Sequence, residues 1–138
     1  MKNVILAMIL AFGMLFTTTF AADAGVEQYV NSGALVQLDA TDSIPDRDGE
    51  IIKYKWKQIR SKGIPKVQLS NKKTATPTFI APEVEETTEI VFKLKTKEIY
   101  NCRRVNKKGK KKGCKKYKSE DNVSIFVQPN LALILEVE

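Results

Sequence analysis

Two-residue alternation limits the fold of this chain more than any other feature. In KYKWKQI, residues 53–59, Tyr54 and Trp56 alternate with lysines. Successive side chains of a β-strand point to opposite faces, so this pattern buries one face of an extended strand and leaves the other in water. An amphipathic helix would repeat every 3.6 residues, and no such period is sustained after the N-terminal segment. The chain is therefore predicted to be all-β.

Several other segments carry strand signals between Gly, Pro, Asn and Asp clusters. They are Leu35 to Leu38, Thr78 to Ala81 between two prolines, TEIVFKLKTK at residues 88–97 and NVSIFV at residues 122–127. About seven short strands with one buried face each cannot close their core as a single sheet. A two-sheet β-sandwich is the natural solution, and 138 residues suffice for one such domain.

The N-terminus has the pattern of an export signal. Lys2 precedes an apolar run from Val4 to Phe16, and small residues follow it. We interpret residues 1–21 as a secretory signal peptide with cleavage before Ala22. The mature chain is then secreted or periplasmic and keeps no transmembrane span. An uncleaved membrane anchor is the alternative, because apolar and threonine residues continue for about the length that a membrane helix needs.

Four motifs carry a resemblance to a known family. In order, the chain contains LDATDSIPDRDGEIIKYKWKQ, ATPTFIAP, TTEIVFKLKTKE and DNVSIFVQP. These motifs, with D-x-D-G, Y-x-W-x-Q and ATPTF-x-AP among them, resemble the PKD-type (polycystic kidney disease type) immunoglobulin-like repeats of bacterial secreted and surface proteins. The resemblance implies an immunoglobulin-like (PKD-like) β-sandwich over residues 22–129, with Trp56 in the core rather than stacking on a sugar. Residues 130–138 would form a tail or a last strand.

The chain departs from that family at residues 99–119, where members usually turn quickly between their last two strands. The insertion contains the two cysteines of the chain, Cys102 and Cys114. In an exported protein two cysteines are most simply one disulfide, which would close a loop of about a dozen residues at the base of the insertion.

The charge is concentrated in this insertion. Ten of the 23 Lys and Arg residues lie there without an acidic residue among them: Arg103, Arg104, Lys107, Lys108, Lys110, Lys111, Lys112, Lys115, Lys116 and Lys118. Such a run attracts polyanions by releasing their counterions. Acidic polysaccharide, lipopolysaccharide, anionic membrane surfaces and extracellular DNA are the expected partners outside the cytoplasm. The lack of interleaved aromatic residues argues against sequence-specific nucleic-acid recognition.

Three alternatives stay open for the basic segment. Its lysines could serve solubility alone. In an immunoglobulin-like topology they would also lie near a group of acids, which they could neutralise: Asp39, Asp42, Asp46, Asp48 and Glu50. Finally, the chain could be a structural or adhesion module that recognises a protein partner through a strand edge or through the apolar residues of the 130–138 tail.

A calcium site is a further hypothesis. The expected topology brings Asp23, the Asp46 and Asp48 pair and Glu98 to one end of the sandwich, and some PKD-type repeats bind calcium at corresponding positions. Calcium prefers several oxygen ligands from flexible loops. The alternative is that D-x-D-G is only a turn, and the nearby cations would weaken a calcium site.

Catalysis is not expected. The sequence contains no histidine, which removes the usual general base and the commonest zinc ligand. No glycine-rich phosphate-binding loop occurs, and Asp46 and Asp48 are neighbours on one turn rather than a facing glycosidase pair. The sequence therefore predicts a non-catalytic exported binding module.

Overall fold

The computed structural model describes residues 22–45 and 48–130. Within these residues all regular structure is β, in eight strands, and no helix occurs. The strands are β1 (Gln28–Asn31), β2 (Leu35–Gln37), β3 (Glu50–Ile59), β4 (Thr78–Ile80), β5 (Thr88–Tyr100), β6 (Arg104–Val105), β7 (Lys111–Lys112) and β8 (Lys115–Gln128). The predicted all-β class is confirmed.

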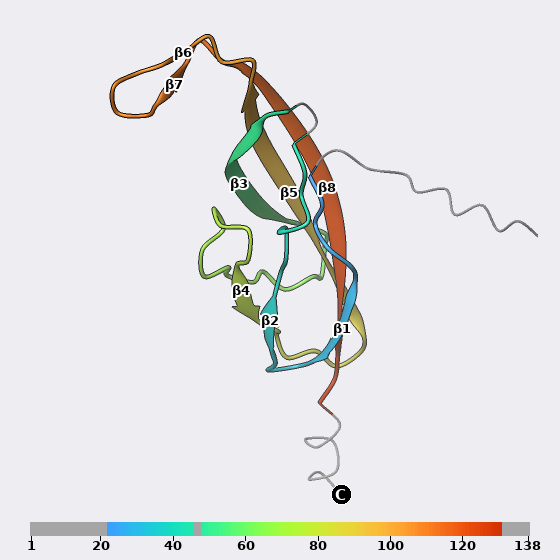
Figure 1. The fold of residues 1–138 in the computed structure, drawn as a ribbon. Coiled ribbons are helices and arrows are strands. Elements are labelled where there is room, and N and C mark those ends of the chain that lie inside the picture. Colours follow the sequence, from blue (N-terminus) through green and yellow to red (C-terminus); the bar gives the residue numbers. More distant parts are fainter. Residues whose placement is uncertain (1–21, 46–47, 131–138) are drawn as a thin grey trace, which may run out of the picture.

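Two sheets pack face to face, as the sequence predicted. Strands β1, β8, β5 and β3 form a four-stranded sheet in that order, and β2 pairs with β4 in a smaller antiparallel sheet. β1 runs parallel to the end of β8, which the sequence pattern did not reveal. The antiparallel pair of β5 and β8 is the longest element of the fold and runs from one end of the sandwich to the other (Figure 1).

The core lies between the two sheets and contains the alternating residues that the pattern marked. Trp56 of β3 is 1% exposed, and Ile90, Phe92 and Leu94 of β5 are fully buried. Phe79 of β4 packs against Phe92 across the sheets with ring centroids 5.0 Å apart. The predicted burial of Trp56 is confirmed, and its indole nitrogen donates a hydrogen bond of 3.1 Å to a backbone carbonyl.

Polar contacts attach the first described residues to the four-stranded sheet. The backbone nitrogen of Ala22 donates to Ser119 Oγ over 2.8 Å, and that of Ala24 donates to Asp121 Oδ2 over 2.8 Å. Gly25 then turns with φ of +80°, and a Cβ at this position would lie 2.7 Å from the carbonyl oxygen of Asp39. Glycine is required because both the conformation and the close approach exclude a side chain.

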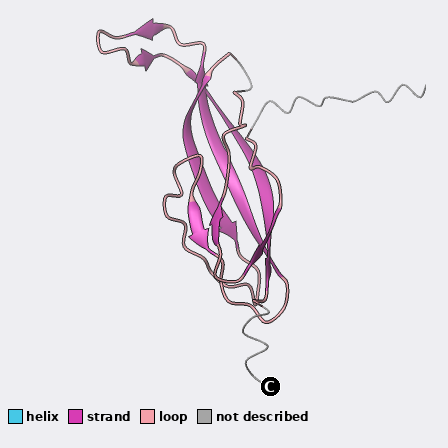
Figure 2. Ribbon diagram, turned by 60° about the horizontal axis from the view of Figure 1, so that its bottom comes forward, coloured by secondary structure: helices cyan, strands magenta, loops and turns pink. Residues whose placement is uncertain are grey.

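Strands β6 and β7 lie outside the sandwich. They form a two-stranded ribbon that projects from the end of the β5–β8 hairpin, beyond the two packed sheets (Figures 1 and 2). We call residues 102–114 the basic finger. The 1–21 segment and the 131–138 tail fall outside the described residues, and so do the predictions of a signal peptide and of a last strand. Within the described residues, no helix is long and apolar enough to cross a membrane.

Candidate polyanion-binding site

The basic finger extends directly from the two paired strands β5 and β8. β5 and β8 stay in continuous register from Thr88 opposite Val127 to Tyr100 opposite Lys115. The segment at 99–119, which was predicted to be an insertion, therefore begins and ends as paired strand. Lys115, Lys116 and Lys118 belong to β8 and are held by this ladder.

The predicted disulfide between Cys102 and Cys114 is present. It lies just beyond the last paired residues of β5 and β8, where the ladder would otherwise end in an open loop. The bridge thus joins the two strands at the base of the finger. The cysteines are 12 residues apart, so the disulfide closes a short loop. This loop contains the ribbon of β6 and β7.

Inside the finger, the backbone forms a small hairpin that sequence patterns did not predict. Arg104 pairs with Lys112 and Val105 with Lys111. Asn106 fixes the tip, because its Oδ1 accepts hydrogen bonds from the backbone nitrogens of two lysines over 3.1 and 2.8 Å. Asn favours such side-chain-to-backbone turns, so the N-x-x-G sequence from Asn106 to Gly109 is a local signal for this turn.

All ten basic residues that were predicted to bind polyanions are exposed. Among the described residues, one ion pair compensates their charge: Lys111 Nζ lies 2.8 Å from Glu50 Oε2 at the start of β3. The basic segment was expected to lie near the acids at one end of the sandwich, and among them it contacts Glu50. Both side chains are about half exposed, and such a pair is worth no more than about 1 kcal/mol.

A hollow of about 600 Å³ lies where the finger approaches the sheet. Its apolar lining comes from Ile52 of β3 and Ile99 of β5, and its positive charge comes from finger lysines and from Lys116 of β8. Lys111 bridges the hollow toward Glu50. The finger and one face of the four-stranded sheet therefore share this space.

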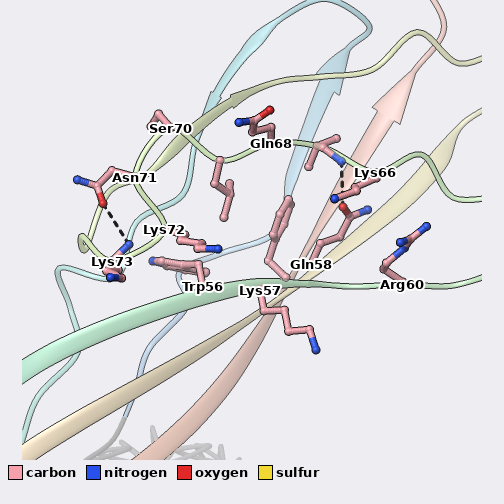
Figure 3. Close-up of a pocket in the computed structure, with 13 residues that line it drawn as sticks. Trp56, Lys57, Gln58, Arg60, Lys66, Gln68, Ser70, Asn71, Lys72 and Lys73 are labelled. Atoms are coloured by element: carbon pink, nitrogen blue, oxygen red, sulfur yellow. Dashed lines mark hydrogen bonds between the residues drawn. The ribbon is translucent and has the colours of Figure 1, made fainter.

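A second and larger hollow, of about 850 Å³, lies beside β3 and is shown in Figure 3. The segment at 66–73 forms its outer wall, and Gln58 holds that wall by donating to the Pro65 carbonyl oxygen over 2.7 Å and accepting from the Val67 nitrogen over 3.0 Å. Five cations line it: Lys57, Arg60, Lys66, Lys72 and Lys73. These residues were not predicted as a group, because the irregular segment that brings them together has no periodic pattern.

The predicted calcium ligands are placed as follows. Asp23 Oδ1 accepts a hydrogen bond from the backbone nitrogen of Gly25, and Asp48 is exposed. Glu98 is 5% exposed within β5, and Asp46 lies outside the described residues. Within the described ranges, no three acidic, histidine or cysteine side chains form a group that could hold a metal ion. The calcium site stays a prediction that depends on Asp46.

Comparison with known proteins places this geometry in a wider context. The model of the family described as K319L-like, PKD domain, matches residues 24–102. No curated protein matches the chain. The solution structure of the PKD domain from the KIAA 1837 protein is similar, with a TM-score of 0.55, 22% identity, and coverage of 82% of this chain and 90% of that one.

A second solved structure is also similar. It is a nucleoside hydrolase-related hypothetical protein from Saccharophagus degradans, described as associated with carbohydrate metabolism, with a TM-score of 0.52 and 21% identity. The match covers 75% of this chain and 22% of that one. At these identities, the likeness to solved structures concerns the fold. The family match stops at Cys102, so most of the basic finger and all of β8 lie beyond it.

Proposed function

The chain belongs to the K319L-like PKD domain family, and from this premise we propose that it is a non-catalytic exported module whose basic finger attracts anionic polymers of the cell envelope or matrix. The β-sandwich provides a rigid support, and the disulfide-closed finger provides the attraction. Acidic polysaccharide, lipopolysaccharide and extracellular DNA are the candidate polymers. The similar Saccharophagus degradans protein, described as associated with carbohydrate metabolism, makes a polysaccharide the first one to test.

One observation carries this proposal. All ten basic side chains of the segment are exposed, and the described acids offer them a single ion pair, with Glu50. The remaining cations face solvent and can replace the counterions condensed on a polyanion, whose release is a gain in entropy. Eight of the ten are lysines, which favours diffuse attraction over bidentate phosphate binding.

The export proposal is supported by the disulfide, since disulfides persist in oxidising compartments. The non-catalytic character is supported by the absence of histidine from the sequence and by the membership of a PKD family. A fold by itself carries no chemistry, so activity would require a reactive group.

Affinity chromatography on immobilised heparin tests the finger. We expect retention to fall steeply with salt, and a finger variant in which Lys107, Lys108, Lys110, Lys111 and Lys112 are all changed to Gln to elute far earlier. The slope of log affinity against log salt should become shallower by roughly four, close to one unit per lost contact.

A matched control removes the same number of charges elsewhere. This control variant changes Arg60, Lys62, Lys66, Lys72 and Lys73 to Gln. It has the same net charge as the finger variant, so it should elute much closer to the wild type. Equal losses in both variants would mean that net charge alone drives retention, and unchanged retention of the finger variant would exclude the finger.

A structural or adhesion role is the second candidate, and exposed apolar residues on the small sheet favour it. Leu35 of β2 is 70% exposed, and Ile80, its register partner on β4, is 59% exposed. An edge strand with apolar neighbours can pair with another chain. A Leu35→Ser, Ile80→Ser variant should then lose a protein partner in cross-linking while heparin retention persists.

A further inference from the structure

The outer face of the four-stranded sheet carries a second concentration of positive charge. Folding places lysines of β3 directly opposite lysines of β5 in three consecutive outward positions: Lys53 opposite Lys97, Lys55 opposite Lys95 and Lys57 opposite Lys93. Lys97 in turn lies opposite Lys118 of β8. We call these seven residues the lysine ladder. Figure 3 shows the side chain of Lys57 on the opposite side of β3 from that of Gln58.

The ladder is an unfavourable arrangement for the protein alone. Like charges directly opposite each other on neighbouring strands destabilise a sheet. Among the described residues, the acid within this grid is Glu120 of β8, which accepts a hydrogen bond from Lys93 over 3.0 Å and also pairs with Lys95. These two lysines, Lys95 first, hold the pKa of Glu120 below its ordinary value. One carboxylate leaves most of the ladder uncompensated.

The ladder and the finger face the same space. Lys116 and Lys118 occupy successive outward positions of β8, and Lys116 lines the hollow of about 600 Å³ between finger and sheet. The hollow is therefore adjacent to the first row of the ladder, which consists of Lys53, Lys97 and Lys118. One positive surface runs from the finger onto the sheet.

An aromatic pair lies at the other end of this face. Phe126 follows Lys118 by eight residues on the outward side of β8, a distance of about 27 Å along a strand. Tyr29 of β1 lies opposite Phe126, and the two rings stack with centroids 4.8 Å apart. Tyr29 is 62% exposed. The face thus combines a long row of cations with an open aromatic ring.

We propose that a linear acidic polysaccharide binds along this outer face, from the hollow beneath the finger, over the lysine ladder, to Tyr29. The inference rests on the proposed polyanion function and extends it to a second set of residues and to one ligand class. The carboxylates or sulfates of the polymer meet the lysines, and the apolar face of a sugar ring packs on Tyr29.

The shape of the face favours a single extended chain over other polyanions. The ladder is three strands wide, about 10 Å across, and its charged positions recur about every 7 Å along each strand. Stable attachment to a bilayer usually needs apolar side chains that insert as well as cations, and the ladder contains none. A single-stranded nucleic acid would favour aromatic rings among the cations, whereas Tyr29 lies beyond their end.

The test compares variants of the full chain for binding heparin and polygalacturonate by titration calorimetry over a series of salt concentrations. The ladder variant is Lys53→Gln, Lys55→Gln, Lys57→Gln, which removes one member of each opposed pair and spares the two lysines that pair with Glu120. Its control, Lys62→Gln, Lys66→Gln, Lys73→Gln, has the same net charge. We expect the ladder variant to lose at least tenfold in affinity, with a salt slope reduced by roughly three, and the control to lose less than about threefold.

A stability measurement separates binding from folding. Because the ladder variant removes like-charge pairs, its melting temperature without ligand should equal or exceed that of the wild type. Tyr29→Ala should weaken binding with an unchanged salt slope, and Tyr29→Phe should restore it, since stacking releases no counterions.

The outcomes distinguish this inference from the proposed function. If the finger variant loses binding while the ladder variant binds like the wild type, the finger hypothesis stands and the ladder is excluded. If the ladder variant loses no more than its control, the ladder is likewise excluded. Tighter binding of duplex DNA or of anionic phosphatidylserine vesicles than of both polysaccharides would overturn the choice of ligand class.

Discussion

Removing the disulfide tests whether the finger belongs to the folding unit. The double variant Cys102→Ser, Cys114→Ser keeps every strand residue. It removes a cross-link between residues 12 positions apart, so the unfolded chain is no longer restricted. In the chain-entropy model, a loop of this length stabilises the folded state by about 3 kcal/mol. Seven basic residues lie between the cysteines without an acid, so their mutual repulsion should add to the loss.

Urea denaturation measures this loss. The chain has a single tryptophan, Trp56, which is buried in the core, so its fluorescence follows the sandwich rather than the finger. We expect the unfolding free energy to fall by about 3 kcal/mol at 0.15 M salt. The deficit should grow at about 0.01 M salt, where the screening length rises from roughly 8 to 30 Å.

A variant of the same loop supplies the control. Val105→Ser changes an exposed residue inside the finger and leaves the cross-link in place, so its unfolding midpoint should match that of the wild type. If the double serine variant also unfolds at the wild-type midpoint, the bridge does not restrict the unfolded chain as argued. A deficit that does not depend on salt would refute the contribution of repulsion.

Three further predictions concern the core, one carboxylate and one turn. Trp56→Ala removes a side chain that is 1% exposed, so the unfolding free energy followed by circular dichroism should fall by about 3–5 kcal/mol, and a loss below 1 kcal/mol would contradict its place in the core. Because its lysine partners lower the pKa of Glu120, the stability it contributes is complete above the ordinary carboxyl pKa and disappears as pH falls through the folded pKa. Wild type and Glu120→Gln should therefore differ in melting temperature at neutral pH and converge in acid, whereas a constant difference would rule out this titration. Gly25→Ala would bring a Cβ to 2.7 Å from the Asp39 carbonyl oxygen, so the melting temperature should drop by several degrees, and an unchanged value would refute the close packing.

Much of the sandwich could be predicted because alternation is a local property. Trp56 was assigned to the buried face from its neighbours in sequence, and it is buried. The parallel pairing of β1 with β8 was not predictable in this way, since it joins residues about a hundred positions apart. β1 is four residues long, too short for a periodic signal.

The candidate site was predictable in part for the same reason. The cysteines and the basic run are adjacent in sequence, so their association could be predicted. For the ion pair of Lys111 with Glu50, the sequence predicted only that the basic segment would lie near a group of acids. The expected topology gives the end of the sandwich that they share, but not the atoms that pair. The ladder could not be predicted from local pattern, because a lysine on one strand meets a lysine on another only once the register of β3 and β5 is known.

The uninterrupted β5–β8 hairpin also decides how the module would respond to mechanical load. A polymer held at the finger and pulled along the strands would draw both strands together, because the disulfide ties them at their tip. The hydrogen bonds to β3 and β1 lie across that direction, so they would be strained in shear and all at once rather than opened one after another. The module would therefore resist tension applied along its strands.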